Sequence, residues 1–529
     1  MSLDGWPGYV SLSRQPLPRL PRMGCTWVGA HTGLTLEAAM NRFGLGTWRH
    51  AGILFALLTA TTFAGCASEV SPPAPASGSQ SVDSPGAVTR RHFQPGVNST
   101  VAIQTTRYAT CTITPPAADQ ATAPAHPVQF VANANGVSRV AFTVDSVPTQ
   151  PISLLIMCVG EDGRADTYPV ELVSGEADAG DTPDPVDPPI GTKVEPLADL
   201  TGSSNAELMA AGYPPRPPQD SPAYTNWLRA VSQPTWRVPP HPVSVPNASR
   251  SGVNFSNNWA GAYASNPGGV PPARPLPNAV FWGVQAEWNV VSVGAMPTSV
   301  PNPIPGYSAV SEWVGLDNTP PGDLWQAGTQ GEESSFSFFG GPTITFTNYF
   351  AWAEALPAAE SVLPNVRANP GDDYYVDQFL ADPNGDTSFS GYGVSSYDNT
   401  MWFLIYNFTS GQSTFDTFSF SANPFFGSTF NGQNAECIIE RPASNVTASN
   451  PAGTTDDLGL YIISAMKNCV VAESPGGANG YSSITYNGTP SIWIGSLTTL
   501  DMKNNSSGDV LTETFISPGV IDFFWTNWQ

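Results

Sequence analysis

The second half of the chain consists of short apolar runs separated by turn residues. From 254 to 529, runs rich in β-branched and aromatic residues alternate with Gly, Pro, Asn and Asp. No segment there keeps a helical period beyond about three turns. This pattern predicts a large antiparallel β-sandwich. Charged residues make up only 12% of the chain, and 49 Gly and 53 Pro indicate many turns and few surface helices.

The same half lacks histidine, because the last of the five histidines is His241. A Ser-His-Asp triad, a Cys-His pair and a His-ligated zinc are therefore excluded there. From Ser251 onward the chain has 24 acidic and 5 basic residues, so carboxylates and amides are the available catalytic groups. We expect no metal and no other cofactor. A net charge of −23 also argues against nucleic acid as a partner.

The N-terminal residues predict export. Residues 1–39 have no apolar core and are expected to lie upstream of the true start. Residues 40–66 read as a lipoprotein-type signal peptide, with an apolar core at Ala51–Phe63 and a lipobox-like end at Cys66. We expect lipid on Cys66 and anchoring in the outer membrane or at the cell surface. Plain secretion is the alternative.

Composition divides the rest of the chain into five parts. Residues 67–91 read as a flexible tether, 92–173 as a small immunoglobulin-like β-sandwich, and 174–198 as an acidic Pro-rich linker. Residues 199–250 contain a helical pair and a Pro-rich stretch, interpreted as a brace or a prosegment. Residues 251–529 form the large sandwich.

Local motifs refine two of these parts. In the small β domain, Asn135-Gly136 between two alternating runs predicts a hairpin. In the helical segment, Ser204 and Glu207 form a capping box, and Gly212 is a plausible end of that helix. An exported protein favours disulfides within each β domain over buried free thiols. The candidates are Cys111 with Cys158, and Cys437 with Cys469.

Six short motifs occur in a fixed order in the large sandwich. They are Asn258-Trp259-Ala260-Gly261, Trp313-Val314-Gly315-Leu316-Asp317, Leu324-Trp325-Gln326-Ala327-Gly328, Ala351-Trp352-Ala353-Glu354, Gly371-Asp372 and Ala435-Glu436-Cys437-Ile438-Ile439-Glu440. Together they resemble the motifs of the glutamic peptidases, the eqolisin family. The resemblance covers about half the chain. It implies a concanavalin A-like antiparallel β-sandwich, similar to legume lectins and bacterial glucanases.

The resemblance also implies roles for individual residues. Gln326 and Glu440 match the family's catalytic pair. Positions that line or support the family's site correspond to Glu354, Asp317, Trp313, Trp259 and Trp352. Strand alternation adds Glu436, which would share a face with Glu440 while Cys437 turns away. For Trp259 and Trp313, core packing and substrate contact are equally good explanations.

Some positions depart from the family's motifs. Trp325 stands between Leu324 and the glutamine, and Thr329 and Gln330 replace an aromatic residue and an Asp. The family's Trp-Tyr-Glu-Trp becomes Trp352-Ala353-Glu354-Ala355, and Cys437 replaces an aromatic residue. These changes affect the expected shape of the cleft more than the catalytic pair.

The resulting prediction is an exported, monomeric acid endopeptidase that acts on proteins or peptides. A Glu carboxylate would activate water and a Gln amide would stabilise the oxyanion. Two alternatives remain: a carbohydrate-binding or adhesive sandwich with an inactive cleft, and a glycoside hydrolase with two carboxylates. The requirement for Gln326 distinguishes the peptidase from the glycosidase.

Overall fold

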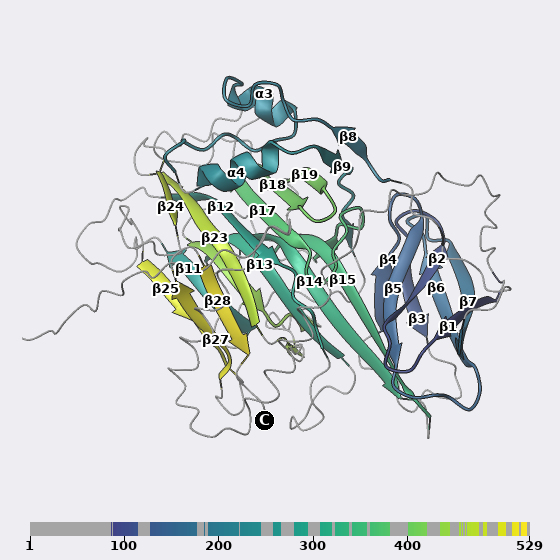
Figure 1. Cartoon of the computed structure of the whole chain (residues 1–529). Coiled ribbons are helices and arrows are strands. Elements are labelled where there is room, and N and C mark those ends of the chain that lie inside the picture. The colour runs from purple at the N-terminus through teal and green to yellow at the C-terminus, as the bar shows by residue number, and fades with distance from the viewer. Residues whose placement is uncertain are drawn as a thin grey trace, which may run out of the picture. The chain divides into compact units, whose positions relative to one another are not determined.

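The computed structural model describes most of the chain after residue 85 (Figure 1). The predicted signal peptide, Cys66 and most of the tether lie outside the described residues. Among the helices that are described, none is long and apolar enough to cross a membrane. The described residues are 86, 88–114, 127–176, 185, 189–221, 223–244, 258–265, 280–294, 307–319, 323–337, 341–356, 360–380, 400–419, 434–444, 454–455, 458, 461, 463–474, 480–483, 496–503, 510–517 and 520–525.

The small β domain is built from the seven strands that come first in the chain. Five of them form one sheet in the order β1-β7-β6-β3-β4, and β2 pairs with β5 outside it. Alternation of apolar and polar residues along 100–106, 128–131, 137–144 and 152–159 predicts four of these strands, and β2, β4, β5 and β6 lie there. The bounds are β1 Thr89–Phe93, β2 Ser99–Gln104, β3 Thr110–Thr114, β4 Val128–Val131, β5 Val137–Val144, β6 Ile152–Val159 and β7 Ala165–Ser174.

Two details of this domain differ from the expectation. The hairpin predicted at Asn135-Gly136 is wrong, because the turn leads from β4 in the five-stranded sheet to β5, which pairs with β2 instead. Gly136 has a φ of +74°, and the Asn133 side chain accepts hydrogen bonds from two backbone N–H groups of the turn. The Cys111–Cys158 disulfide is present, yet it joins neighbouring strands β3 and β6 of one sheet. An immunoglobulin-type bridge would join the two sheets.

Most of the remaining strands form two large sheets. Sheet 1 has the order β10-β16-β15-β14-β13-β20-β11-β25, and sheet 2 has the order β26-β27-β28-β23-β12-β17-β18-β19-β9-β8, with β24 beside β23. In sheet 1 the bounds are β10 Val243–Ser244, β11 Trp259–Ser265, β13 Tyr307–Thr319, β14 Asp323–Ser337, β15 Thr343–Ala355, β16 Ser361–Val362, β20 Asn434–Glu440 and β25 Ser496–Leu500. In sheet 2 they are β8 Thr192–Val194, β9 Thr235–Arg237, β12 Val280–Asn289, β17 Asp373–Leu380, β18 Thr400–Asn407, β19 Gln412–Ser419, β23 Ile463–Ser474, β24 Gly480–Ser483, β26 Met502–Lys503, β27 Val510–Ser517 and β28 Val520–Trp525. A short pair, β21 Ala443–Ser444 and β22 Thr454–Thr455, lies apart from both sheets.

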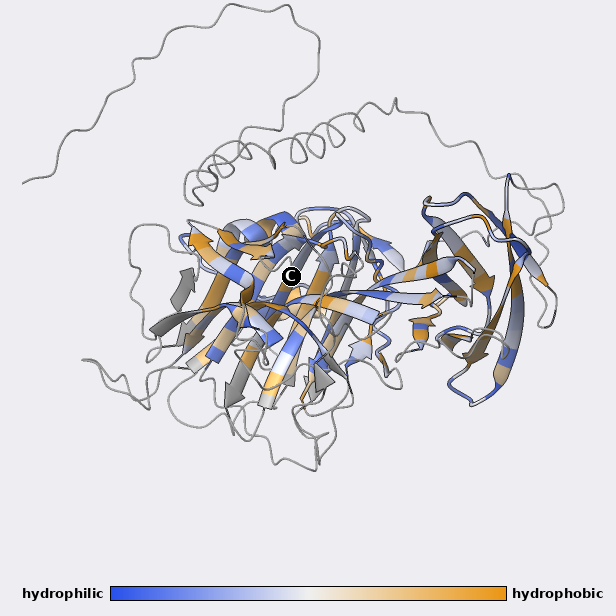
Figure 2. Cartoon of the chain, turned by 90° about the horizontal axis from the view of Figure 1, so that it is seen from below, coloured by the Kyte–Doolittle hydropathy of each residue, from blue (hydrophilic) through white to orange (hydrophobic). Residues whose placement is uncertain are grey.

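The main hydrophobic core joins sheet 1 to sheet 2. From sheet 1 it takes alternate residues such as Ala262, Val314 and Ile439, and from sheet 2 residues such as Trp288 and Val376. Polar and apolar residues succeed one another along the strands, as the colouring in Figure 2 shows. The protein is thus mostly β, with several largely antiparallel sheets, as expected. Because one face of sheet 1 is used in this core, its other face, called here the site face, is left for other contacts.

The small β domain is joined to sheet 1 by backbone hydrogen bonding. Strand β5 pairs with the end of β15, where Val144 lies opposite Ile344 (Figure 1). The small domain's core also includes Phe336, Ile344 and Phe346 from the β14–β15 hairpin. The small domain therefore extends sheet 1 at its edge.

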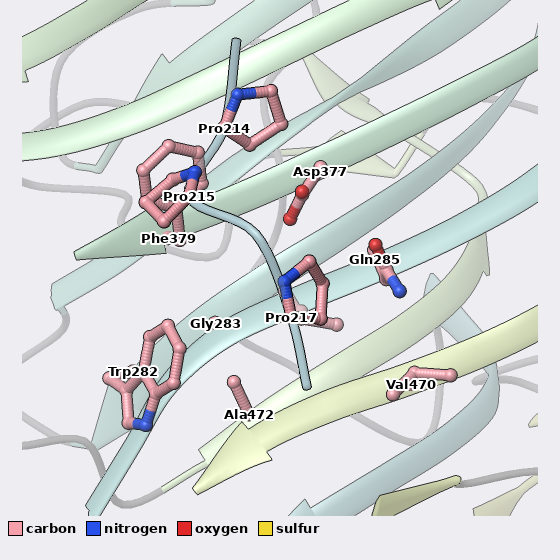
Figure 3. A pocket seen from close by; sticks show the side chains of 11 residues that line it. Pro214, Pro215, Pro217, Trp282, Gly283, Gln285, Asp377, Phe379, Val470 and Ala472 are labelled. Atoms are coloured by element: carbon pink, nitrogen blue, oxygen red, sulfur yellow. The ribbon is translucent and has the colours of Figure 1, made fainter. Parts of the chain in front are cut away.

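The helical segment packs on sheet 2. Helix α3 spans Asn205–Ala210 with the predicted capping box, and α4 spans Ala223–Val231. In α4, Arg229 pairs with Glu287 and Asp373 at 2.7 and 2.6 Å. Between the helices, three prolines cover sheet 2 over Gln285 and Asp377 and leave a cavity of only about 10 Å³ (Figure 3). These contacts hold the segment on sheet 2, away from the site face, and its interpretation as a brace or a prosegment stays a prediction.

The Cys437–Cys469 disulfide links sheet 1 to sheet 2, because Cys437 lies on β20 and Cys469 on β23. We expect the double variant Cys437→Ala/Cys469→Ala to lower the free energy of unfolding by roughly 2–4 kcal/mol, since the bridge restricts the unfolded chain. Guanidinium denaturation with and without a reductant measures this loss. The reductant should shift the transition of the wild type further than that of the variant. Equal midpoints for the two oxidised proteins would contradict the prediction.

Candidate functional site

Most of the predicted site residues come from one face of sheet 1. In one row across the sheet, Glu354 on β15 lies opposite Gln326 on β14, which lies opposite Gly315 on β13, which lies opposite Glu436 on β20. Four residues further along β20, Glu440 lies between Ser311 on β13 and Trp259 on β11. Since alternate residues of a strand share a face, Gln326 and Glu440 are on the same side of the sheet.

Gln326 is held by a neighbouring carboxyl group. Its Nε2 donates a hydrogen bond to Glu354 Oε2 at 2.5 Å, and both side chains are buried. The amide oxygen of Gln326 has no hydrogen-bond partner among the described residues. An amide nitrogen carries two donors, so one N–H fixes the side chain and the other can serve a ligand. Glu354 is therefore a positioning residue for Gln326.

Glu440 is held from the neighbouring strand β13. The indole Nε1 of Trp313 donates a hydrogen bond to Glu440 Oε2 at 2.7 Å, and the carboxyl group is 1% exposed. Trp313 lies on β13, the strand between β14 and β20. The same indole thus fixes one carboxylate oxygen, and the Trp313 side chain lies against Gly315 and Gly328, where a Cβ atom would collide with it.

Three of the four tryptophans of the motifs form a packed layer on the site face. Trp259, Trp313 and Trp352 belong to one apolar cluster and are at most 2% exposed. The Trp259 and Trp313 rings meet edge to face with centroids 4.9 Å apart. Trp352 Nε1 donates to Ser311 Oγ at 3.0 Å. Packing and positioning therefore account for these residues in the structure as it stands.

The departures from the family motifs leave the strand register intact. Trp325 belongs to the core between the sheets, while Gln326 on the next position faces the other way. Strand β14 pairs with β15 from Trp325 to Ser337 without a register shift. Cys437 likewise turns toward sheet 2, as alternation predicted.

Three other candidates have different surroundings. Glu436 is fully buried and lies in the same row as Gln326 and Glu354. For Asp317 the structure describes only the backbone, which pairs with Leu324 on β14. Asp372 of the Gly371-Asp372 motif accepts hydrogen bonds from Asn369 and Asn407 before β17. Its contacts are those of a turn and not of a site.

Sequence reasoning missed a carboxyl group at this site. Glu360 precedes β16, is 2% exposed, and has one carboxyl oxygen without a hydrogen-bond partner among the described residues. Burial, together with the nearby Glu354, Glu332 and Glu440, holds the pKa of Glu360 well above its ordinary value. Glu360 lies in none of the six motifs and in no alternating run, so no local signal marked it.

The arrangement supplies a carboxylate and an amide on one face of sheet 1, both fixed by neighbouring side chains. Among the described residues, no three His, Cys, Asp or Glu side chains are grouped so that they could hold a metal ion. A buried carboxylate can accept a proton from water, and a fixed amide N–H can donate to a developing oxyanion. Addition of water to a carbonyl carbon needs these two functions.

No protein-family model matches the chain, and no curated protein matches it. Among solved structures, it is similar to scytalido-glutamic peptidase bound to a transition-state analogue inhibitor, with 18% identity over 51% of this chain and 98% of the other, at a TM-score of 0.34. It is also similar to SCP-B, a member of the eqolisin family of peptidases, in complex with the tripeptide Ala-Ile-His. That match has 16% identity, the same coverage and a TM-score of 0.31. Both similarities are distant.

Proposed function

We propose that the chain is an acid endopeptidase of the glutamic type. The observation that carries the proposal is the position of Gln326, fixed by Glu354, on the same face of sheet 1 as two buried glutamates: Glu440, held by Trp313, and Glu436, which lies in the row of Gln326. The motif order in the sequence supports the same assignment. The absence of histidine after His241 requires a mechanism without imidazole.

In the proposed reaction, water attacks the carbonyl carbon of the scissile peptide bond. Glu440 accepts a proton from this water while the new C–O bond forms, and the carbonyl electron pair moves onto oxygen. The second Nε2–H of Gln326, which is not bonded to Glu354, donates a hydrogen bond to this oxyanion. Glu440 then passes the proton to the leaving nitrogen as the C–N bond breaks. Water is consumed, and two peptide products leave with no change in oxidation state.

We expect digestion of an unfolded protein to peak at roughly pH 2–5, where carboxyl groups titrate. The test incubates the full chain with a denatured substrate from pH 2 to 8 and quantifies new N-termini. The activity should resist chelators, serine-directed reagents and pepstatin-type inhibitors. An optimum above about pH 7, or complete loss with a chelator, would refute the mechanism. Hydrolysis of glycans in place of proteins would favour the two-carboxylate glycosidase instead.

The location of this activity is part of the proposal. We propose export, with a lipid on Cys66 and the tether of residues 67–91 holding a monomeric enzyme near the membrane. Metabolic labelling with a fatty acid would test this, with Cys66→Ser as the control. The proposed partners are peptide or protein substrates, without nucleic acid.

A further inference from the structure

A large cavity lies between the small β domain and the site face. Its volume is about 840 Å³. The small domain contributes Gln129, Phe130 and Val131 of β4, and sheet 1 contributes Phe350 and Val362 with the acidic residues Glu332 and Glu360. Val131 also packs against the cluster that contains Trp259, Trp313 and Trp352. The cavity therefore borders the apolar cluster of the site face, and Glu360 in its lining lies near enough to Glu354 and Glu440 to feel their charges.

Glu360 is a buried polar residue in the lining of this cavity. One of its carboxyl oxygens makes no hydrogen bond within the described residues, although the side chain is 2% exposed. An unsatisfied buried polar group of this kind is costly. Such a group needs an explanation, and a ligand that completes its hydrogen bonding would provide one.

The other charges around the cavity are distributed unevenly. Glu332 accepts hydrogen bonds from Tyr307 and Gln330 at 3.1 and 2.9 Å. Arg139 donates to the Pro185 carbonyl at 2.6 Å, and Arg367 is exposed. With Glu354 and Glu440 also near Glu360, the buried end of the cavity is acidic. The two arginines of the lining, Arg139 and Arg367, are bonded to a backbone carbonyl or exposed.

We propose that this cavity binds a lysine or arginine side chain of the peptide substrate, with Glu360 as its charged partner. The inference rests on the proposed function for the identity of the ligand as a peptide. The aliphatic part of such a side chain can lie along Phe130, Phe350 and Val362, because long basic side chains bury their stems on apolar surface. Their charged end then reaches the carboxyl group.

Binding of the cation is coupled to the release of a proton from Glu360. In the empty cavity, burial and the neighbouring carboxyl groups favour the neutral form of Glu360. The bound ammonium or guanidinium favours the charged form, so binding releases a proton. The preference for a basic side chain should therefore increase as the pH rises from about 4 to 6. The binding enthalpy should also depend on the ionisation enthalpy of the buffer.

Isothermal titration calorimetry with two capped hexapeptides, one with a central lysine and one with norleucine, tests the proposal. The full chain with Gln326→Ala, which leaves the carboxyl groups around Glu360 unchanged, is used so that cleavage is slow and does not interfere. At pH 6 we expect the lysine peptide to bind roughly tenfold more tightly, and Glu360→Gln to remove this preference. Glu333→Gln, on the opposite face of β14, should retain it. If Glu360→Gln does not fold, the protein with Glu360 provides the test by itself. A lysine preference that increases from about pH 4 to 6 with proton release supports the proposal, and a preference that is independent of pH contradicts it.

The outcomes separate the two proposals. Equal affinity for the two peptides in the protein with Glu360, or a lysine preference that survives Glu360→Gln, would overturn the inference even if the wild type cleaves peptides. A preference that depends on Glu360 together with no cleavage by the wild type at any pH would overturn the proposed function and support the binding site.

Discussion

Replacing Glu440 by Gln is expected to lower kcat for peptide hydrolysis by at least about 10²–10⁴-fold, because the substituted amide cannot accept the proton of the attacking water. Replacing Gln326 by Ala should lower kcat by about 10²–10³-fold through loss of the oxyanion donor. In both variants KM should change less than kcat, since the lost contacts form in the transition state. Steady-state kinetics on a quenched fluorescent peptide at about pH 4 measures both values.

Matched controls come from buried residues that lie outside the site face. Glu333→Gln changes a carboxyl group that is 6% exposed on the other face of β14, and Gln285→Ala changes a glutamine on β12 of sheet 2. Both controls should retain kcat within a few-fold if they fold. Equal kcat in Glu440→Gln and Glu333→Gln would reject Glu440 as the base. Trp313→Phe should give an intermediate loss, because it removes the hydrogen bond that positions Glu440.

The parts of the structure that could be predicted are those with a local signal. Alternation along 434–440 assigned Glu440 and Cys437 to opposite faces, and the disulfide from Cys437 to Cys469 on sheet 2 agrees with this. The capping box at Ser204 and Glu207 is another local feature, and both of its hydrogen bonds are present. Each of these predictions depends on residues that lie within a few positions of one another.

The parts that could not be predicted depend on long-range pairing. Strands β5 and β15 are about two hundred residues apart in sequence, and neither shows locally that the other completes its sheet. The Asn-Gly turn after β4 has the local chemistry of a hairpin, but tertiary pairing sends the two strands to different sheets. Glu360 is returned beside Glu354 by the short step from β15 to β16, but the cavity around it is completed by β4 of the small domain, more than two hundred residues earlier in the chain.

Buried carboxyl groups should also make the folded protein more stable in acid than at neutral pH. Burial raises the pKa of Glu312 to about 8, with smaller opposing effects from Ser464 and the Val291 N–H. Burial likewise raises the pKa of Glu333 and of Asp377 to about 7. The ordinary values are 4.5 for Glu and 3.8 for Asp. Between the ordinary pKa and the raised pKa of each group, the folded chain holds more protons than the unfolded chain. The free energy of unfolding therefore falls as pH rises through this range.

The stabilisation is complete below about pH 4 and is lost as pH rises toward about 8, at up to about 1.4 kcal/mol per pH unit for each group. We therefore expect the midpoint of thermal unfolding to be several degrees higher at pH 4 than at pH 8.

Glu312→Gln should raise the midpoint at pH 8 and leave it nearly unchanged at pH 4, because a glutamine can still accept from Val291 and donate to Ser464 without ionising. Asp220→Asn, at an exposed position, is the matched control and should leave the pH dependence as it is. A midpoint that rises from pH 4 to 8 would contradict the assignment, since it would mean that these acids ionise on folding. An enzyme that works at acid pH gains from this sign, because Glu312, Glu333 and Asp377 remain neutral there and keep their full contribution to stability.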